Sequence, residues 1–125
     1  MAKFRPYSTE QGELVPTYLG DWVPENHLAR MISEIVDQLD LTEITKRYSN
    51  RGEEAYHPAL LCKLWFYGYA TGVFTSRKIR CALDENIPFR WLCGGRKPDF
   101  RTISDFRKDN LDILPTLFGQ TVKAA

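Results

Sequence analysis

The chain has 125 residues, of which 43% are hydrophobic, so it can bury the core of one domain. Its formal net charge of +1 at pH 7 predicts no charged partner for the chain taken as a whole. No CxxC spacing, no secretory leader and no bilayer-length apolar stretch are present, which argues against a disulfide framework, a zinc site and a membrane partner, so we expect a cytoplasmic protein.

The first 23 residues predict an extended arm, because prolines stand beside apolar residues several times in this stretch. We expect large apolar side chains to hold the arm on the surface of the domain. These anchors are Tyr7, Leu14, Tyr18, Leu19 and Trp22. A disordered leading segment is the alternative.

The clearest helical pattern begins at Pro24, which suits the first position of a helix. Apolar residues recur at steps of three and four in what we name the 28–39 seam: Leu28, Met31, Ile32, Ile35, Val36 and Leu39. We interpret this seam as core, with dimerisation as the alternative. His27 is expected to cap the helix or lie on the surface rather than act in catalysis. A short second helix is predicted over residues 40–48.

A helix beginning at Pro58 is apolar almost all the way round, which predicts a central position in the fold. Gly68 inside it costs about 1 kcal/mol relative to alanine, so we expect a neighbouring helix to approach closely there. Gly72 is predicted to end the helix. The aromatic residues of this helix suit core packing better than a base-stacking platform, because their positions go round the helix.

Residues 74–86 predict a fourth helix, capped by Thr75 or Ser76, with Ile79, Cys81, Ala82 and Leu83 on its inner face. Its first turns carry Arg77, Lys78 and Arg80, although cations at this end oppose the helix dipole. A phosphate backbone that passes this helix end would explain them. The other two cysteines, Cys62 and Cys93, are likewise expected to be reduced core residues.

A short helix over residues 89–93 is predicted to end at Gly94-Gly95, and Arg96-Lys97-Pro98 forms a basic loop. Asp99 is a good N-cap for the helix that follows, whose apolar stripe is Phe100, Ile103 and Phe106. Two short helices with a compact connector are typical of a helix-turn-helix. An apolar helix over residues 111–123, kinked or restarted at Pro115, is expected to close the chain.

We therefore expect an all-α fold, a compact bundle of about five to seven helices in a single domain that spans residues 1–125. Its parts are an arm (1–23), a helical core (24–72), a helix-turn-helix-like part (75–110) and a C-terminal helix (111–123).

Charge divides unevenly between the two ends of this domain. Residues 1–45 carry three basic and eight acidic side chains, a net of −5, whereas residues 77–108 carry nine basic and four acidic ones, a net of +5. The asymmetry favours a polyanionic partner for the second part, with mutual pairing of the two parts as the alternative.

Several motifs resemble, in order and spacing, the N-terminal domain of bacterial insertion-sequence transposases of the DDE type. They are Tyr56-His57-Pro58-Ala59-Leu60-Leu61, Tyr67-Gly68-Tyr69-Ala70-Thr71-Gly72, Ser76-Arg77-Lys78-Ile79, Asn86-Ile87-Pro88-Phe89-Arg90-Trp91-Leu92 and Pro98-Asp99-Phe100-Arg101-Thr102-Ile103-Ser104-Asp105-Phe106-Arg107. The resemblance also takes in Trp22-Val23-Pro24-Glu25-Asn26-His27. It implies a protein that binds the terminal inverted repeats of its own mobile element.

We expect bases and nearby phosphates to be contacted by Arg101, Thr102, Ser104 and Lys108, and the DNA backbone by Arg77, Lys78, Arg80, Arg96 and Lys97, with Arg107 in either role. In the family, divalent metals sit in an RNase H-like domain that this chain shows no strands to build, so no cofactor and no catalysis are expected here. Asp99 and Asp105 fall on different helix faces and neither His27 nor His57 has a nucleophile nearby in the sequence. The alternatives are a multimerisation module that uses the 28–39 seam and a truncated regulatory fragment.

Overall fold

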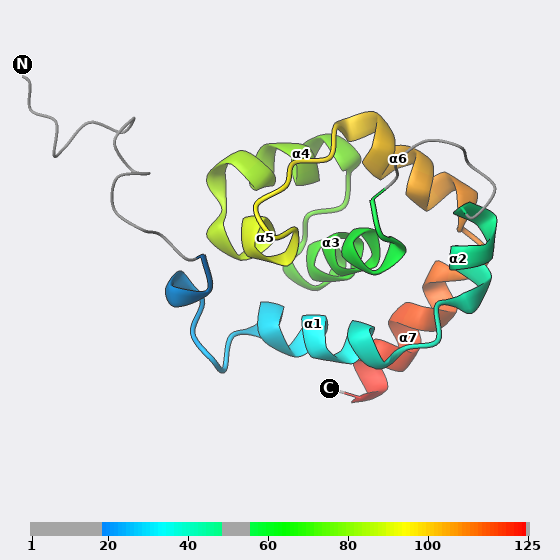
Figure 1. Cartoon of the computed structure of the whole chain (residues 1–125), viewed down its shortest axis with the longest axis horizontal. Helices are drawn as coiled ribbons and strands as arrows, with labels where there is room; N and C mark the ends of the chain where they lie inside the picture. Colours follow the sequence, from blue (N-terminus) through cyan, green and yellow to red (C-terminus); the bar gives the residue numbers. More distant parts are fainter. Residues whose placement is uncertain (1–18, 49–55, 125) are drawn as a thin grey trace, which may run out of the picture.

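A computed structural model describes residues 19–48 and 56–124, so the predicted anchors Tyr7, Leu14 and Tyr18 lie outside the described residues. Within these ranges every regular element is helical, and the all-α prediction is confirmed (Figure 1). A 3-10 turn, η3 (Leu19–Trp22), comes first. The α-helices are α1 (Leu28–Gln38), α2 (Thr42–Tyr48), α3 (Pro58–Thr71), α4 (Ser76–Glu85), α5 (Ile87–Leu92), α6 (Phe100–Asp109) and α7 (Leu114–Ala124).

Helix α3 is the centre of the bundle, as its all-round apolar sequence predicted, and α1, α4, α5 and α6 pack around it (Figure 1). Its largest side chains, Trp65 and Phe66, are at most 1% exposed, so they are core residues and not a base-stacking platform. Burying a side chain such as Phe66 contributes about 1.5–3 kcal/mol. The interpretation of the aromatic residues as core is therefore confirmed.

Part of the 28–39 seam is buried where α1 packs on α3. Ile32 and Val36 are buried, and Lys63 of α3 forms an ion pair with Asp37 of α1 at 2.8 Å. Leu28 and Met31 at the start of the seam remain 37% and 40% exposed. Two of the six seam residues are therefore core, and the first turn of the seam is exposed.

Helix α1 begins at Leu28 and not at Pro24, because the side chain of His27 provides the N-cap. Its Nδ1 accepts a hydrogen bond from the backbone N–H of Ala29 at 3.0 Å, which confirms the expected capping role. His57 caps α3 in the same way through the N–H of Ala59. These two histidines are thereby held in structural positions at the starts of helices.

Gly68 is required by a chain reversal rather than by a neighbouring helix, which corrects the prediction. A Cβ at this position would lie 2.6 Å from the carbonyl oxygen of Val73, and 3.4 Å from the side chain of Ile79 in α4. The carbonyl of Gly68 accepts hydrogen bonds from the N–H groups of Gly72 and Val73. Gly72 has a φ of 85°, so the left-handed end predicted for this helix is present.

The turn η3 is held by Arg30 and not by Trp22, whose side chain is 61% exposed, contrary to the predicted anchoring. The Arg30 guanidinium donates to the carbonyl oxygens of Gly20 and Val23 at 2.6 and 2.9 Å. Its Cζ also lies 4.7 Å from the ring centroid of Trp91 in α5. Arg30 of α1 thus contacts both η3 and α5.

The end of α6 is tied to α2 by polar contacts. Asn110 is fully buried, and its side-chain amide donates to the carbonyl of Phe106 at 2.7 Å. Arg47 of α2 donates to the Asn110 side chain at 3.0 Å and forms an ion pair with Asp112 at 2.7 Å. Pro115 lies at the second residue of α7, so the chain restarts there as expected.

Cys81 was expected on the inner face of its helix and is exposed instead. The helix phase explains this correction. Ile79 and Leu83 lie four residues apart and both are fully buried, which turns Cys81 between them outward. Cys62 and Cys93 are buried, and all three cysteines are free, as predicted.

Candidate nucleic-acid interface

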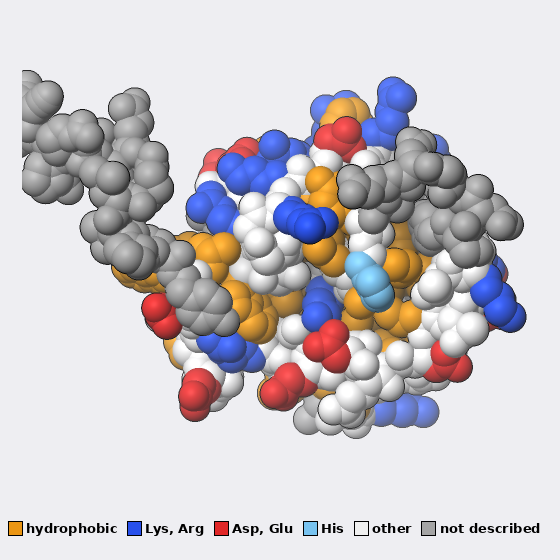
Figure 2. Space-filling view, in the orientation of Figure 1, with side chains coloured by type: hydrophobic (Ala, Val, Ile, Leu, Met, Phe, Trp, Pro, Cys, Tyr) orange, Lys and Arg blue, Asp and Glu red, His pale blue; other side chains and the backbone are white. Residues whose placement is uncertain are grey.

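Helices α4 and α6 pack against each other and bring together the part of the chain with the largest excess of positive charge. We use the name basic face for the surface of α4, the connector 93–99 and α6. Figure 2 shows Lys and Arg side chains gathered along the upper edge of the molecule, over these elements, while Asp and Glu predominate along the lower edge near α1. The asymmetry seen in the sequence is therefore also an asymmetry in space.

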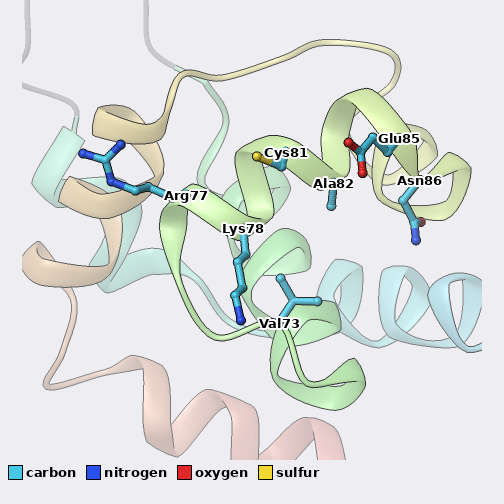
Figure 3. A pocket seen from close by; sticks show the side chains of 7 residues that line it. All are labelled: Val73, Arg77, Lys78, Cys81, Ala82, Glu85 and Asn86. Atoms are coloured by element: carbon cyan, nitrogen blue, oxygen red, sulfur yellow. The ribbon is translucent and has the colours of Figure 1, made fainter.

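At the start of α4, Thr75 provides the cap: its Oγ accepts from the backbone N–H of Lys78 at 3.1 Å. Arg77 and Lys78 follow and both are exposed. Figure 3 shows that they leave the helix in different directions, Arg77 toward α6 and Lys78 toward Val73 in the loop before α4. Both side chains line one hollow along α4, but their charged groups point in different directions.

Two of the predicted backbone-binding cations are partly neutralised by Asp84 near the end of α4. Arg80 approaches this carboxylate to 3.1 Å and Lys97 of the connector to 2.9 Å. Hydrogen bonds from Lys97 and Arg80 hold the pKa of the Asp84 carboxyl below its usual value. The pairs fasten the connector to α4, so Arg80 and Lys97 are less available to a phosphate than the sequence suggested.

The start of α6 has the predicted cap. The Asp99 carboxylate accepts a hydrogen bond from the backbone N–H of Thr102 at 2.8 Å, and hydrogen bonds from Thr102 lower the pKa of Asp99. Beyond the cap, Arg101 and Lys108 are exposed and Ser104 is half-buried. These three side chains and the half-buried Thr102 lie away from Ile103 and Phe106, which are fully or almost fully buried. The outward strip of α6 is as predicted.

Arg107 is held inward in a way that the sequence did not suggest. Its Nη1 donates to the carbonyl oxygen of Phe74 at 3.2 Å, and its Cζ lies 5.0 Å from the ring centroid of Trp65. The residue therefore joins α6 to the loop before α4 and to the central helix. Arg107 borders a hollow at the start of α4, with Lys108, Ser104, Ser76, Thr75, Trp65 and Leu111 as the other lining residues.

Two aromatic side chains on or beside the basic face were missed as surface residues. Phe74 is 57% exposed and Phe100 is 41% exposed, although Phe100 was expected to share the buried stripe of α6. The correction has a geometric reason, since the guanidinium of Arg77 covers the Phe100 ring, with Cζ at 4.5 Å from the ring centroid. The Phe100 ring is therefore covered by a side chain of α4 and not by the core.

The connector between α5 and α6 begins with Cys93, Gly94 and Gly95, where the two glycines have φ values of 62° and 86° and end α5 as predicted. Arg96 in this connector is exposed. Helix α6 packs mainly on α4 rather than on α5. The helix-turn-helix arrangement therefore stays a prediction.

Among residues 19–48 and 56–124, no three His, Cys, Asp or Glu side chains gather in a way that could hold a metal ion. No helix in the same ranges is long and apolar enough to cross a bilayer.

Arg90, a further cation of this region, donates to the carbonyl oxygens of Leu83 and Asp84 at 3.0 and 2.6 Å, so it stabilises the end of α4. The basic face thus offers charge and hydrogen-bond donors.

A family model described as Transposase domain (DUF772) matches residues 17–109, about three quarters of the chain. No curated protein and no solved structure matches. The matched range includes η3, the helices α1 to α6 and every predicted DNA-binding residue, and it ends at the last residue of α6.

Proposed function

Because the chain belongs to the transposase-domain family DUF772, as its motifs predicted, we propose that it is a DNA-binding domain of an insertion-sequence transposase. Its partner would be the terminal inverted repeats of the element. The observation that carries the proposal is a set of exposed cations on the basic face. Within the described residues none of them takes part in an ion pair: Arg77, Lys78, Arg96, Arg101 and Lys108.

Unpaired cations on one edge suit a duplex, because each Lys or Arg that neutralises a phosphate releases a condensed counterion. Five such contacts correspond to a fall of log K with log salt of roughly 4 to 5, at about 0.9 per phosphate. Arg80 and Lys97 contribute less, since both already contact Asp84. Arg107 is proposed to position α6 rather than to bind DNA, because its Nη1 donates to the carbonyl of Phe74 and its guanidinium lies over the ring of Trp65.

Helix α6 is the proposed reading element. Arg101, Ser104 and Lys108 lie on its outward strip, and a helix of this size fits the major groove of B-DNA. Thr102 is placed beside them, although its backbone N–H is used by the Asp99 cap. Strand cleavage with divalent metal is proposed to belong to another domain of the transposase, and we assign no catalytic residue in this one.

The proposal is tested by fluorescence anisotropy with a duplex that carries an inverted repeat of the element, titrated between about 50 and 200 mM salt. The double substitution Arg101→Ala/Lys108→Ala should weaken binding and lower the salt slope by about 2. Lys123→Ala in α7 removes one exposed charge away from the basic face and serves as the control. Binding that ignores both salt and the double substitution would contradict the proposal.

The alternative is a multimerisation module. It is favoured by one observation, the exposed apolar side chains of Trp22, Leu28 and Met31 on η3 and the first turn of α1. Ile32 and Val36 of the 28–39 seam are buried, so the available surface is small. Light scattering separates the two ideas, because a chain that binds DNA as a strict monomer would not need this surface.

A further inference from the structure

We propose that Arg77 reads a guanine in the major groove and that Phe100 is the positioning residue that fixes its guanidinium. The inference rests on the proposed DNA-binding function. It adds a base contact from α4, whereas the sequence analysis expected base contacts from α6 and a backbone contact from Arg77. It begins from the stacked pair on the basic face, in which the Arg77 Cζ lies 4.5 Å from the centroid of the Phe100 ring.

The Phe100 ring is surface structure and not core. It is 41% exposed at the first residue of α6, whereas Ile103 and Phe106 of the same helix are at most 1% exposed. A phenylalanine with this exposure is only partly buried by the fold. Its contact is instead with a cation, and aromatic faces attract guanidinium groups by roughly 0.5–1 kcal/mol at exposed sites.

Stacking occupies the flat face of a guanidinium and leaves its N–H groups pointing outward in the plane. Among the described residues, Arg77 forms no ion pair and donates no hydrogen bond. Arg30 and Arg107, which also lie over rings, differ in this respect because both donate to backbone carbonyls. Arg77 therefore combines a guanidinium held over a ring with free donors.

A restricted plane with a free fork of donors is what recognition of guanine needs. The O6 and N7 atoms of guanine accept two hydrogen bonds side by side in the major groove, and an arginine can meet both at once. A phosphate contact needs only a positive charge near the backbone, which the unstacked Arg96 and Lys78 can provide. The stacked arginine is thus suited to a base rather than to the backbone.

The position of Arg77 places the contact beside the proposed reading helix. Figure 3 shows the side chain leaving α4 on the side of α6, and its ring partner is the residue before Arg101. The two arginines come from different helices that pack together, so both approach the same end of α6. A groove that receives the start of α6 would receive the Arg77 guanidinium with it.

The test is a selection with the full 125-residue chain from a pool of random duplexes, followed by competition binding with the selected duplex. The variants are Arg77→Lys, Phe100→Leu and Phe100→Tyr, with Lys123→Arg in α7, outside the basic face, as the control. Position by position, guanine is replaced by 7-deazaguanine, which lacks N7, and by inosine, which keeps O6 and N7 and lacks the minor-groove amine.

For the wild type we expect one guanine at which 7-deazaguanine weakens binding about 10-fold and inosine less than about 2-fold, since a bidentate pair is worth about 1–3 kcal/mol. Arg77→Lys and Phe100→Leu should lose this preference and keep affinity for random duplex, whereas Phe100→Tyr and Lys123→Arg should retain it. A guanine preference that survives Arg77→Lys, or a wild type that selects no guanine, overturns the inference and leaves the DNA-binding proposal intact. A wild type that binds no duplex at all overturns the proposed function itself.

Discussion

The indole N–H of Trp65 donates a hydrogen bond to the backbone carbonyl of Ile103 at 3.0 Å, and both residues are at most 1% exposed. This bond joins the central helix α3 to α6, which carries the outward strip of the basic face. Because it lies in the core, water cannot replace it when it is lost. The orientation of α6, and with it the proposed DNA-binding surface, therefore depends on the interior of the protein.

Replacing Trp65 with phenylalanine should lower the free energy of unfolding by about 1–3 kcal/mol, through the lost hydrogen bond and the space left behind. Denaturant melts followed by circular dichroism measure this change. Trp22→Phe is the matched control, because Trp22 is 61% exposed, and it should change stability by less than about 0.5 kcal/mol. Equal effects of the two substitutions would contradict the role given to Trp65.

Gly68→Ala should destabilise the protein although alanine is normally favoured in a helix by about 1 kcal/mol. The added Cβ would stand 2.6 Å from the carbonyl oxygen of Val73, a backbone atom that cannot move away freely. Gly119→Ala in α7 provides the control, since a Cβ there meets nothing within 4 Å. Thermal melts should show opposite signs for the two variants, and a stabilising Gly68→Ala would refute the close approach.

The ion pairs of Asp84 predict a pH dependence of stability. The pKa of Asp84 is lowered in the folded protein, so its contribution to stability is present above the unfolded value near 3.8 and is lost as the pH falls through the folded pKa. The difference in unfolding free energy between the wild type and Asp84→Asn should therefore shrink below about pH 4. Urea melts across this range measure it, and a difference that is constant with pH would show that the pairs do not stabilise the fold.

Asp84→Asn should also tighten DNA binding under the proposed function. The substitution removes a carboxylate from the basic face and releases Arg80 and Lys97 to meet phosphates. We expect higher affinity and a steeper salt dependence in anisotropy titrations. Asp37→Asn, on the α1 side of the molecule, removes the same charge from an ion pair with Lys63 and should leave the salt slope unchanged. Weaker binding by Asp84→Asn would show that order in the connector matters more than charge.

The cysteines should differ in reactivity toward a thiol reagent. Burial raises the pKa of Cys62 and of Cys93 to about 12, so both are protonated and shielded at neutral pH, whereas Cys81 is exposed. Mass spectrometry should find one label on Cys81 in the folded protein and three labels in denaturant. Labelling of Cys93 at the rate of Cys81 would show that the start of the α5–α6 connector opens readily.

Much of the local structure could be predicted, because the signals lie within a few residues of one another. Thr75 and Asp99 cap their helices as expected, and Gly72 ends α3. The inner-face position of Cys81 and the burial of Phe100 were predicted wrongly. The exposure of Cys81 follows from the phase of the buried residues in α4. That of Phe100 depends on which neighbouring helix covers it, and periodicity alone does not specify that neighbour.

The sequence by itself determined the helical class, the caps, the central place of α3 and the family, because helix periodicity, capping hydrogen bonds and motif spacing are properties of the chain order. Only the tertiary structure decided which cations are free. The Asp84–Lys97 ion pair and the contact of Arg107 with Trp65 join residues that are separated in the chain. Both contacts make a cation less available to an outside partner. The same packing of α4 on α6 set Arg77 over Phe100, because side chains from two helices meet only where the core holds those helices together.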